Sequence, residues 1–345
     1  MDNNEQKILL FLKENPLKSS GEILSESGLE ISLATLKRIL NNLLSENYIS
    51  VSGIGKSTKY KISDSFEVLA PIDVENYYQI EIDGRKIKEN FNFDLIEEIL
   101  SKINLFTKNE LDFLNQLQQK FIENVSQLSE NEYINELERL AIDLSWKSSQ
   151  IEGNTYSLLE TEKLLKEKET ATGKTKDEAV MLLNHKDALD FLIENQDYFN
   201  DISISKIENI HRILVKELGV SKNLRKRKVG ISGTNYKPLD NEFQIREAVE
   251  KSCILINSKQ IIFEKALLVL MLISYIQPFM DGNKRTARIV SNAVLMYYNF
   301  CPLSFRTVDS IDYKKAMLLF YEQNNISAFK KIFIDQFEFA VNTYF

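Results

Sequence analysis

Residues 277–288, QPFMDGNKRTAR, bring together the side chains and the turn that a phosphate-binding loop needs. A glycine-containing turn followed by the open N-terminus of a helix presents backbone N–H groups to an anion. Arg285 and Arg288 are three residues apart, so on a helix both can reach the same anion. The carboxylate of Asp281 can hold a divalent cation that bridges phosphates. The segment therefore predicts a polyphosphate site with a metal, although a capped helix with solvated arginines has the same spacing.

A second candidate segment, Ser148 to Gly153, ends a helical pattern that starts at Leu128. Ser148 and Glu152 are four residues apart and share one face of a helix. Gly153 can adopt the left-handed conformation that ends a helix. The Glu152 carboxylate then lies at the last turn, where the helix dipole disfavours an anion unless a cation compensates it. A surface glutamate before a helix end is the ordinary alternative.

Two helices must position the 277–288 loop. The apolar run Ala266–Ile276 predicts a buried helix, and Pro278 ends it at Gln277 because the residue before proline avoids the helical conformation. Apolar residues at helical spacing predict a new helix from Lys284. The only histidines, His185 and His211, lie in helical patterns, and we expect structural or helix-surface roles for both.

Residues 1–65 predict a small separate module. We expect helices at 7–15, at 21–27 with an N-cap at Ser20, and after an N-cap at Ser32, followed by a hairpin over 48–62. This order resembles a winged helix-turn-helix. In a DNA-binding role the groove and phosphate contacts fall to Lys37, Arg38, Lys56 and Lys59. The alternative is protein contact or dimerisation, because the acidic residues of the module roughly balance its basic ones.

Composition limits the class of protein. The net charge of −7 gives no global basic field, so any DNA contact must come from a local patch. The two cysteines lie far apart with no CxxC spacing, which fits a reducing compartment. The start of the chain is polar and acidic, and no apolar run is long enough to span a bilayer. We expect a cytoplasmic protein without membrane contact, with residues 66–110 as a connector.

Three segments in order resemble the Fic family. Residues 278–288 match its signature, HxFx(D/E)GN(G/K)RxxR, except that Gln277 replaces the histidine. Ser148 to Gly153 resembles the inhibitory motif (S/T)xxxE(G/N), and residues 225–238 resemble the family's flap hairpin. The resemblance implies a mainly α fold for residues 111–345: a helical core, a β-hairpin flap and an inhibitory helix at about 128–152.

The resemblance also implies site roles. Asp281 is expected to bind Mg²⁺, and Arg285 to stabilise charge on the phosphates of ATP. Arg288 is expected to orient the γ-phosphate. Glu152 is expected to pair with Arg288 and so to displace the γ-phosphate. The backbone of the turn is expected to hold the α- and β-phosphates at Gly282, Asn283 and Lys284. The flap is expected to dock an unknown target protein, whose Ser, Thr or Tyr hydroxyl accepts AMP, through Gly233, Thr234, Asn235 and Tyr236.

Two departures change these expectations. A glutamine amide cannot take a proton near pH 7, and losing a general base costs on the order of 10²–10⁴-fold in rate. A natural degenerate member and an engineered inactive variant both fit Gln277. Lys284 replaces the commoner glycine, as in Doc-type kinases, whereas Arg288 favours AMP transfer. Three hypotheses follow: an impaired, autoinhibited adenylyltransferase, a nucleotide-responsive DNA-binding regulator, and a Doc-like kinase. A homodimer is compatible with each.

Overall fold

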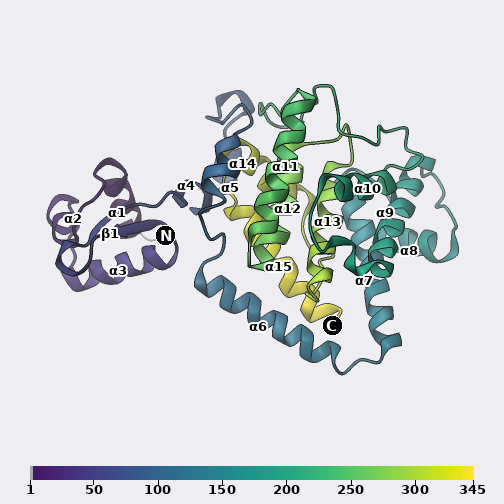
Figure 1. Cartoon of the computed structure of the whole chain (residues 1–345), viewed down its shortest axis with the longest axis horizontal. Coiled ribbons are helices and arrows are strands. Elements are labelled where there is room, and N and C mark those ends of the chain that lie inside the picture. Colours follow the sequence, from purple (N-terminus) through teal and green to yellow (C-terminus); the bar gives the residue numbers. More distant parts are fainter. Residues whose placement is uncertain (1–2) are drawn as a thin grey trace.

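The structure, a computed structural model, describes residues 3–345 except for the side chain of Lys56. It is mainly helical, as expected, and a small N-terminal module lies at one end of the long axis, beside a larger helical body (Figure 1). None of the helices within residues 3–345 has both the length and the apolarity needed to cross a membrane.

The N-terminal module has the expected order of three helices and a hairpin. Its elements are α1 (Asn3–Glu14), α2 (Ser20–Glu26), α3 (Leu33–Ser45), β1 (Ile49–Ser52) and β2 (Lys59–Ile62), with a short 3₁₀ turn at Gly55–Ser57. The strands are antiparallel and pair Ile49 with Ile62. Ser32 caps α3 as expected, but Ser19, not Ser20, caps α2, because its hydroxyl accepts from the backbone N–H of Glu22. The assignment as a winged helix-turn-helix stays a prediction.

The connector contains only short helices and turns, and it lies against the helical body. It contains α4 (Phe66–Leu69), α5 (Val74–Tyr78), a 3₁₀ turn at Ile82–Gly84 and a π turn at Leu95–Ile99. The hydroxyl of Tyr77 donates to the buried carboxylate of Glu322 at 2.6 Å, and the backbone N–H of Lys88 donates to the carbonyl of Glu322 at 2.8 Å. These contacts fix the connector on the end of the helix that carries Glu322.

The helical body is built around one buried helix, α12 (Ile262–Ile276), in which every residue from Phe263 to Ile276 is buried. α13 (Asn283–Tyr297) packs along it, and the body contains further helical elements (Figure 1). These are α6 (Lys108–Val125), α7 (Glu130–Ile151), α8 (Leu158–Glu167), α9 (Lys176–Glu194), a 3₁₀ turn at Gln196–Phe199, α10 (Ile204–Leu214), α11 (Glu242–Ser258), α14 (Ser310–Gln323) and α15 (Ser327–Thr343). A mainly apolar helix that is buried all round must be covered on every side, and this covering positions the start of the loop that follows it.

The expected β-hairpin flap is wrong. Within the part of the chain that the structure describes, β1 and β2 form the only sheet, and residues 225–238 form no paired strands but contain a turn at Ser232–Gly233. The connector takes the pairing instead: the backbone N–H of Lys237 donates to the carbonyl of Glu89 at 2.7 Å, beside a parallel bridge from Asn90 to Lys237. The backbone partner of Lys237 is thus 148 residues away in the sequence.

Candidate functional site

The loop between α12 and α13 has a backbone that only certain residues tolerate. Gln277 ends α12 with φ of 52°, and Gly282 precedes α13 with φ of 81°, both in the left-handed region. A Cβ on Gly282 would also lie 3.2 Å from Cγ1 of Val215. Glycine is therefore required here, and the turn leaves the N-terminus of α13 facing outward as an anion cradle.

The side chain of Asn283 braces this loop from inside. Its Oδ1 accepts from the backbone N–H of Phe279 at 2.8 Å, and its Nδ2 donates to the carbonyl of Phe279 and to Oε1 of Gln277. Both ends of the amide are thus used within the protein. A phosphate contact at Asn283 must come from its backbone.

Gln277 is also held at both ends of its amide. Nε2 donates to the carbonyl of Ser274 at 2.7 Å, while Oε1 accepts from Asn283 at 2.9 Å. The side chain of Gln277 therefore supports the loop rather than pointing freely at a reacting group. It borders a cavity of about 290 Å³ whose other walls include Glu152, Gly230, Ser232, Lys284 and Tyr321.

Two arginines bring buried positive charge to the same place. Arg285 is 1% exposed and Arg288 is fully buried. Arg285 donates through Nη2 to Asp281 at 3.1 Å, but its Nε and Nη1 have no partner among the described residues. Burial lowers the pKa of Arg285 from its ordinary value, partly offset by the charges of Asp281 and Glu152. Unpaired buried N–H donors are costly, so these atoms are available to donate to an anion.

Glu152 pairs with Arg288, although the two residues lie 136 positions apart. Oε1 of Glu152 accepts from Nη2 of Arg288 at 2.9 Å, and Oε2 lies 3.4 Å from Nζ of Lys284. Burial opposes ionisation of Glu152, yet the charges of Arg288 and Lys284 hold its pKa below the usual value. The cation that the helix end needs is therefore present, and Gly153 has the expected left-handed backbone, with φ of 101°.

Ser148 completes the contact between α7 and α13. Its hydroxyl accepts from Nε of Arg288 at 2.8 Å, and its carbonyl accepts from Nη2 at 3.0 Å. The Arg288 guanidinium also lies 5.2 Å from the centre of the Tyr313 ring, in a cation–π contact. The segment 148–153 and the 277–288 loop thus form one site.

Asp281 is the one metal-ligand candidate that the sequence identified, and its side chain is 64% exposed. Oδ1 accepts from the backbone N–H of Gly282 at 2.6 Å, and Oδ2 accepts from Arg285. No group of three or more His, Cys, Asp or Glu that could hold a metal occurs within residues 3–345. A single exposed carboxylate fits Mg²⁺, which takes one or two protein carboxylates and otherwise phosphate oxygens and water.

His211 belongs to this site, and sequence reasoning missed it. The ring stacks on Phe279 at 3.7 Å, and Nε2 lies 2.9 Å from the carbonyl of Asp281. Burial lowers its pKa to about 4, so the ring is neutral and braces the loop as a donor. His185 is likewise fully buried, so the helix-surface alternative is wrong for both histidines, while the structural role agrees with their burial. Apart from its rarity, nothing in the sequence near His211 marks it.

Arg225 is a second missed residue. It is 1% exposed, and its Nε donates to the carbonyl of Gln277 at 2.6 Å, while its backbone N–H donates to the carbonyl of Pro278 at 2.9 Å. The guanidinium thus satisfies carbonyls left open where α12 ends. Burial lowers the pKa of Arg225 from its ordinary value.

The expected docking residues of the flap do not lie along the cavity. Thr234 and Tyr236 are buried, and Tyr236 donates to the carbonyl of Tyr275 in α12. The connector occupies the other two, because Arg85 donates to the carbonyl of Gly233 and Asn235 donates to Asp83. Residues 230–232 line the cavity instead. The docking role of residues 233–236 stays a prediction.

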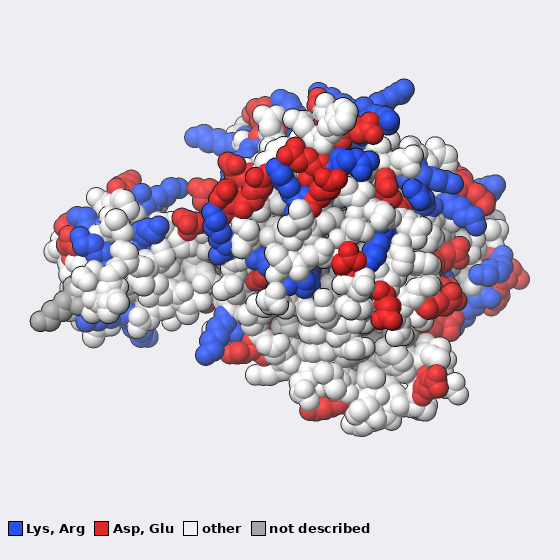
Figure 2. Space-filling view, viewed as in Figure 1, with Lys and Arg blue, Asp and Glu red and all other residues white. Residues whose placement is uncertain are grey.

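The expected DNA contacts lie on the N-terminal module. Lys37 and Arg38 on α3 and Lys59 on β2 are exposed, whereas the side chain of Lys56 lies outside the described residues. Basic and acidic side chains are mixed on the visible face of this module (Figure 2). DNA binding stays a prediction.

A second, larger cleft of about 540 Å³ lies where the N-terminal module meets the body. Its walls include Glu46, Tyr48, Ile72, Glu110 and Lys330, and none of the 277–288 residues. Of the charged groups described above, Glu152 and Lys284 line the smaller cavity, and Glu152 is paired with Arg288, so this cavity is the candidate site.

Comparison with known proteins gives a consistent picture. Residues 201–295 match the family model described as Fic/DOC family. The Protein adenylyltransferase Fic of Nematostella vectensis is 30% identical over 179 residues, which are 49% of this chain and 40% of that protein. The chain thus spans less than half the length of this relative.

Solved structures share the fold. Fic-1 (residues 134–508) from C. elegans has a TM-score of 0.59 at 21% identity, covering 68% of this chain and 72% of that one. A Fic domain containing signaling protein from Bacteroides thetaiotaomicron has a TM-score of 0.57 at 19% identity, covering 67% of this chain and 95% of that one.

Proposed function

With a Fic/DOC family domain at residues 201–295, we propose that this chain binds ATP with Mg²⁺ at the 277–288 loop. We further propose that it is built as a protein adenylyltransferase, restrained by Glu152 and impaired by Gln277. The observation that carries the proposal is the buried guanidinium of Arg285, with two unpaired N–H donors beside the open N-terminus of α13. That arrangement suits a phosphate chain and is costly without one.

The residues present divide the work of binding. Asp281 would hold Mg²⁺ together with phosphate oxygens, and the metal would supply charge neutralisation on the phosphates. Arg285 donates to the transferring and leaving phosphates, and the backbone from Gly282 to Lys284 donates to the α- and β-phosphates. Arg288 meets the γ-phosphate only when Glu152 releases it, because both anions use the same buried guanidinium. In this way Glu152 restrains the productive position of ATP.

In the proposed reaction, a hydroxyl oxygen of a target protein forms a bond to the α-phosphorus. The bond from the α-phosphorus to the bridging oxygen of the β-phosphate breaks, and pyrophosphate leaves. The hydroxyl proton needs a base, and Gln277 has neither the basicity nor a free amide. We expect binding to persist and transfer to be slower by about 10²–10⁴-fold than with a base.

The test restores the base. Gln277→His is incubated with Mg²⁺ and ATP labelled at the α- or the γ-position, alone and combined with Glu152→Gly. Label from α-ATP on any protein, including the chain itself, and stronger with Glu152→Gly, supports adenylyl transfer. Label from γ-ATP alone supports a Doc-like kinase instead. No label from either position in the double variant would sink the transferase proposal, and Gln277→Asn is the matched control that adds no base.

A second candidate is a nucleotide-responsive DNA-binding regulator. It rests on the exposed Lys37 and Arg38 of α3 together with the amide of Gln277, which is fully used in the fold. Its test is a gel-shift titration over salt concentration with DNA from upstream of its own gene, with and without ATP. Phosphate contacts make such binding salt-dependent, so absence of a shift at low salt argues against it.

A further inference from the structure

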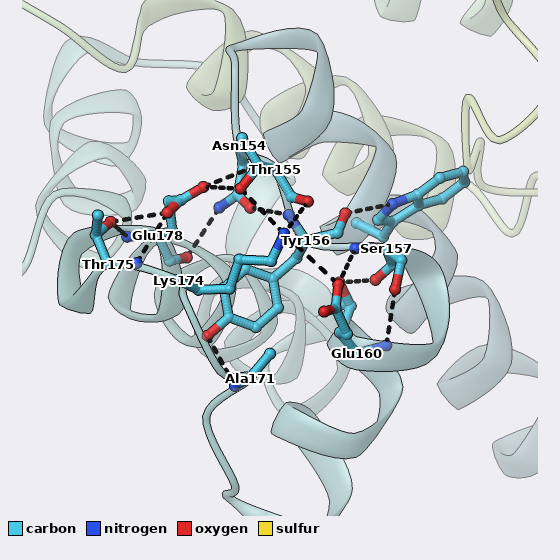
Figure 3. A network of polar contacts seen from close by, with 11 residues as sticks. Asn154, Thr155, Tyr156, Ser157, Glu160, Ala171, Lys174, Thr175 and Glu178 are labelled. Carbon is cyan, nitrogen blue, oxygen red and sulfur yellow. Dashed lines mark hydrogen bonds and ion pairs between the residues drawn. The ribbon is translucent and has the colours of Figure 1, made fainter.

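The chain that follows Glu152 is held by a polar network centred on Glu178 of α9 (Figure 3). One carboxylate oxygen of Glu178 accepts from the backbone N–H and the hydroxyl of Thr155, at 2.8 and 2.5 Å. The other accepts from the backbone N–H and the hydroxyl of Thr175, both at 2.9 Å. Glu178 thus joins the start of α9 to the segment that leaves α7.

Lys174 closes the network from the other side. Its Nζ donates to the carbonyl of Thr155 at 2.6 Å and lies 3.2 Å from the hydroxyl of the same residue. Thr155 is therefore contacted by an anion at its N–H and hydroxyl and by a cation at its carbonyl. Charge-assisted hydrogen bonds of this kind are roughly twice as strong as neutral ones. We call Thr155, Lys174 and Glu178 the clasp.

The residues on either side of Thr155 are tied down as well. Nδ2 of Asn154 donates to the carbonyl of Glu178 at 2.9 Å, and its Oδ1 accepts from the N–H of Tyr156 at 3.0 Å. Nε1 of Trp146, on α7 itself, donates to the carbonyl of Tyr156 at 3.0 Å. The segment therefore folds back against α7, and hydrogen bonds hold its backbone on both sides of Thr155.

This anchoring bears directly on Glu152. The backbone N–H of Gly153 and of Asn154 donate to the carbonyls of Gln150 and Ser149, which closes the last turn of α7. Since Asn154 and Thr155 are fixed by α9, the last turn cannot unwind unless the clasp opens. Glu152 then keeps its carboxylate on Arg288 at 2.9 Å.

We infer that the clasp positions Glu152, and so sets how tightly the protein binds ATP relative to ADP. The clasp lies at the surface: Thr155 is exposed, and Lys174 and Glu178 are partly exposed. It can therefore open without disturbing the buried core around α12. This inference rests on the proposed nucleotide site, in which Glu152 and the γ-phosphate compete for Arg288.

The experiment measures Kd for Mg²⁺–ADP and Mg²⁺–ATP by calorimetry on the full chain. Thr155→Val removes one hydroxyl at nearly constant shape, and Glu178→Gln removes the charge. In both variants we expect ADP affinity within about twofold of the parent and ATP affinity raised about three- to tenfold, since residues that modulate coupling act by about 0.5–2 kcal/mol. Adding either change to Glu152→Gly is expected to raise ATP affinity no further.

Glu132→Gln is the matched control. Glu132 accepts from the N–H and hydroxyl of Ser129 at the far end of α7, so the same change is made in a cap that does not touch the clasp. A loss of packing alone lowers both affinities together and leaves their ratio unchanged. If ADP binds and the ratio of ATP to ADP affinity is unchanged in both clasp variants, the inference is overturned while the site stands. If ADP binds to none of the proteins, the proposed function fails first.

Discussion

The ion pair between Glu152 and Arg288 leads to the most demanding prediction, the substitution Glu152→Gln. Glutamine keeps an oxygen at 2.9 Å from Nη2 of Arg288 but removes the negative charge. Arg288 is fully buried, whereas Lys284, the other partner of Glu152, is 22% exposed and can turn to water. The loss of stability therefore arises mainly at Arg288, whose buried charge loses its anionic partner.

The size of the effect follows from what remains around Arg288. Removing one partner of a buried pair costs about 3–5 kcal/mol, and a hydrogen bond to a charged group is worth about 1.5–3 kcal/mol. Because Ser148 and the new amide still accept from Arg288, we expect a loss of about 2 kcal/mol in the free energy of unfolding. At roughly 2 °C per kcal/mol for a chain of this size, Tm falls by about 4 °C.

The assay is differential scanning calorimetry with and without Mg²⁺–ADP or Mg²⁺–ATP. In the parent, ATP and ADP are expected to raise Tm about equally, because Glu152 excludes the γ-phosphate from Arg288. In Glu152→Gln, ATP is expected to raise Tm more than ADP, since the γ-phosphate restores the missing anion. Glu132→Gln, an exposed carboxylate on the same helix, is the control. An unchanged Tm together with equal shifts for both nucleotides would refute the reasoning.

Three further predictions concern the support of the site. Burial holds the pKa of folded His211 at about 4, below its ordinary 6.5, so the unfolded chain binds the proton first and the free energy of unfolding decreases as pH falls. His211→Gln should reduce this decrease by about 2 kcal/mol between pH 7 and 5, as measured by urea unfolding. An unchanged pH dependence would contradict this prediction. Arg85→Ala leaves the buried carboxylate of Glu322 without its cation at 3.1 Å and should lower the free energy of unfolding by about 3 kcal/mol, whereas Arg85→Lys should lose less. Gly282 has φ of 81°, and Cγ1 of Val215 would lie 3.2 Å from a Cβ added there. Gly282→Ala should therefore weaken nucleotide binding at least about tenfold, as measured by calorimetry. An affinity equal to that of the parent would contradict the proposed phosphate contacts of this turn.

Much of the local structure could be predicted because it depends on residues a few positions apart. The N-cap of α3 at Ser32 and the register of β1 with β2 follow from short-range spacing and turn chemistry. The end of α12 at Gln277 follows from Pro278, and the left-handed Gly153 from the end of a helical pattern. The misplaced N-cap at Ser20, one residue from the true Ser19, reflects two adjacent serines that local chemistry does not separate.

The flap and its surroundings could not be predicted in the same way. A segment without paired strands of its own depends on a neighbour for backbone hydrogen bonds. Here the connector supplies a hydrogen bond and a bridge to Lys237. Arg225 and His211 likewise act on the loop from 52 and 70 positions away. Such contacts depend on how the helices cover α12, which no short stretch of sequence specifies.

The properties of the 277–288 loop therefore divide into those set by the sequence and those set by the tertiary structure. The sequence by itself determined the residue types: an acid, a glycine in a turn, two arginines at helical spacing, and an amide where a base is expected. Only the tertiary structure decided which N–H donors of Arg285 stay unpaired and that Glu152 holds Arg288. The physical reason is that side-chain chemistry is local, whereas the pairing of Glu152 with Arg288 joins residues 136 positions apart in the sequence.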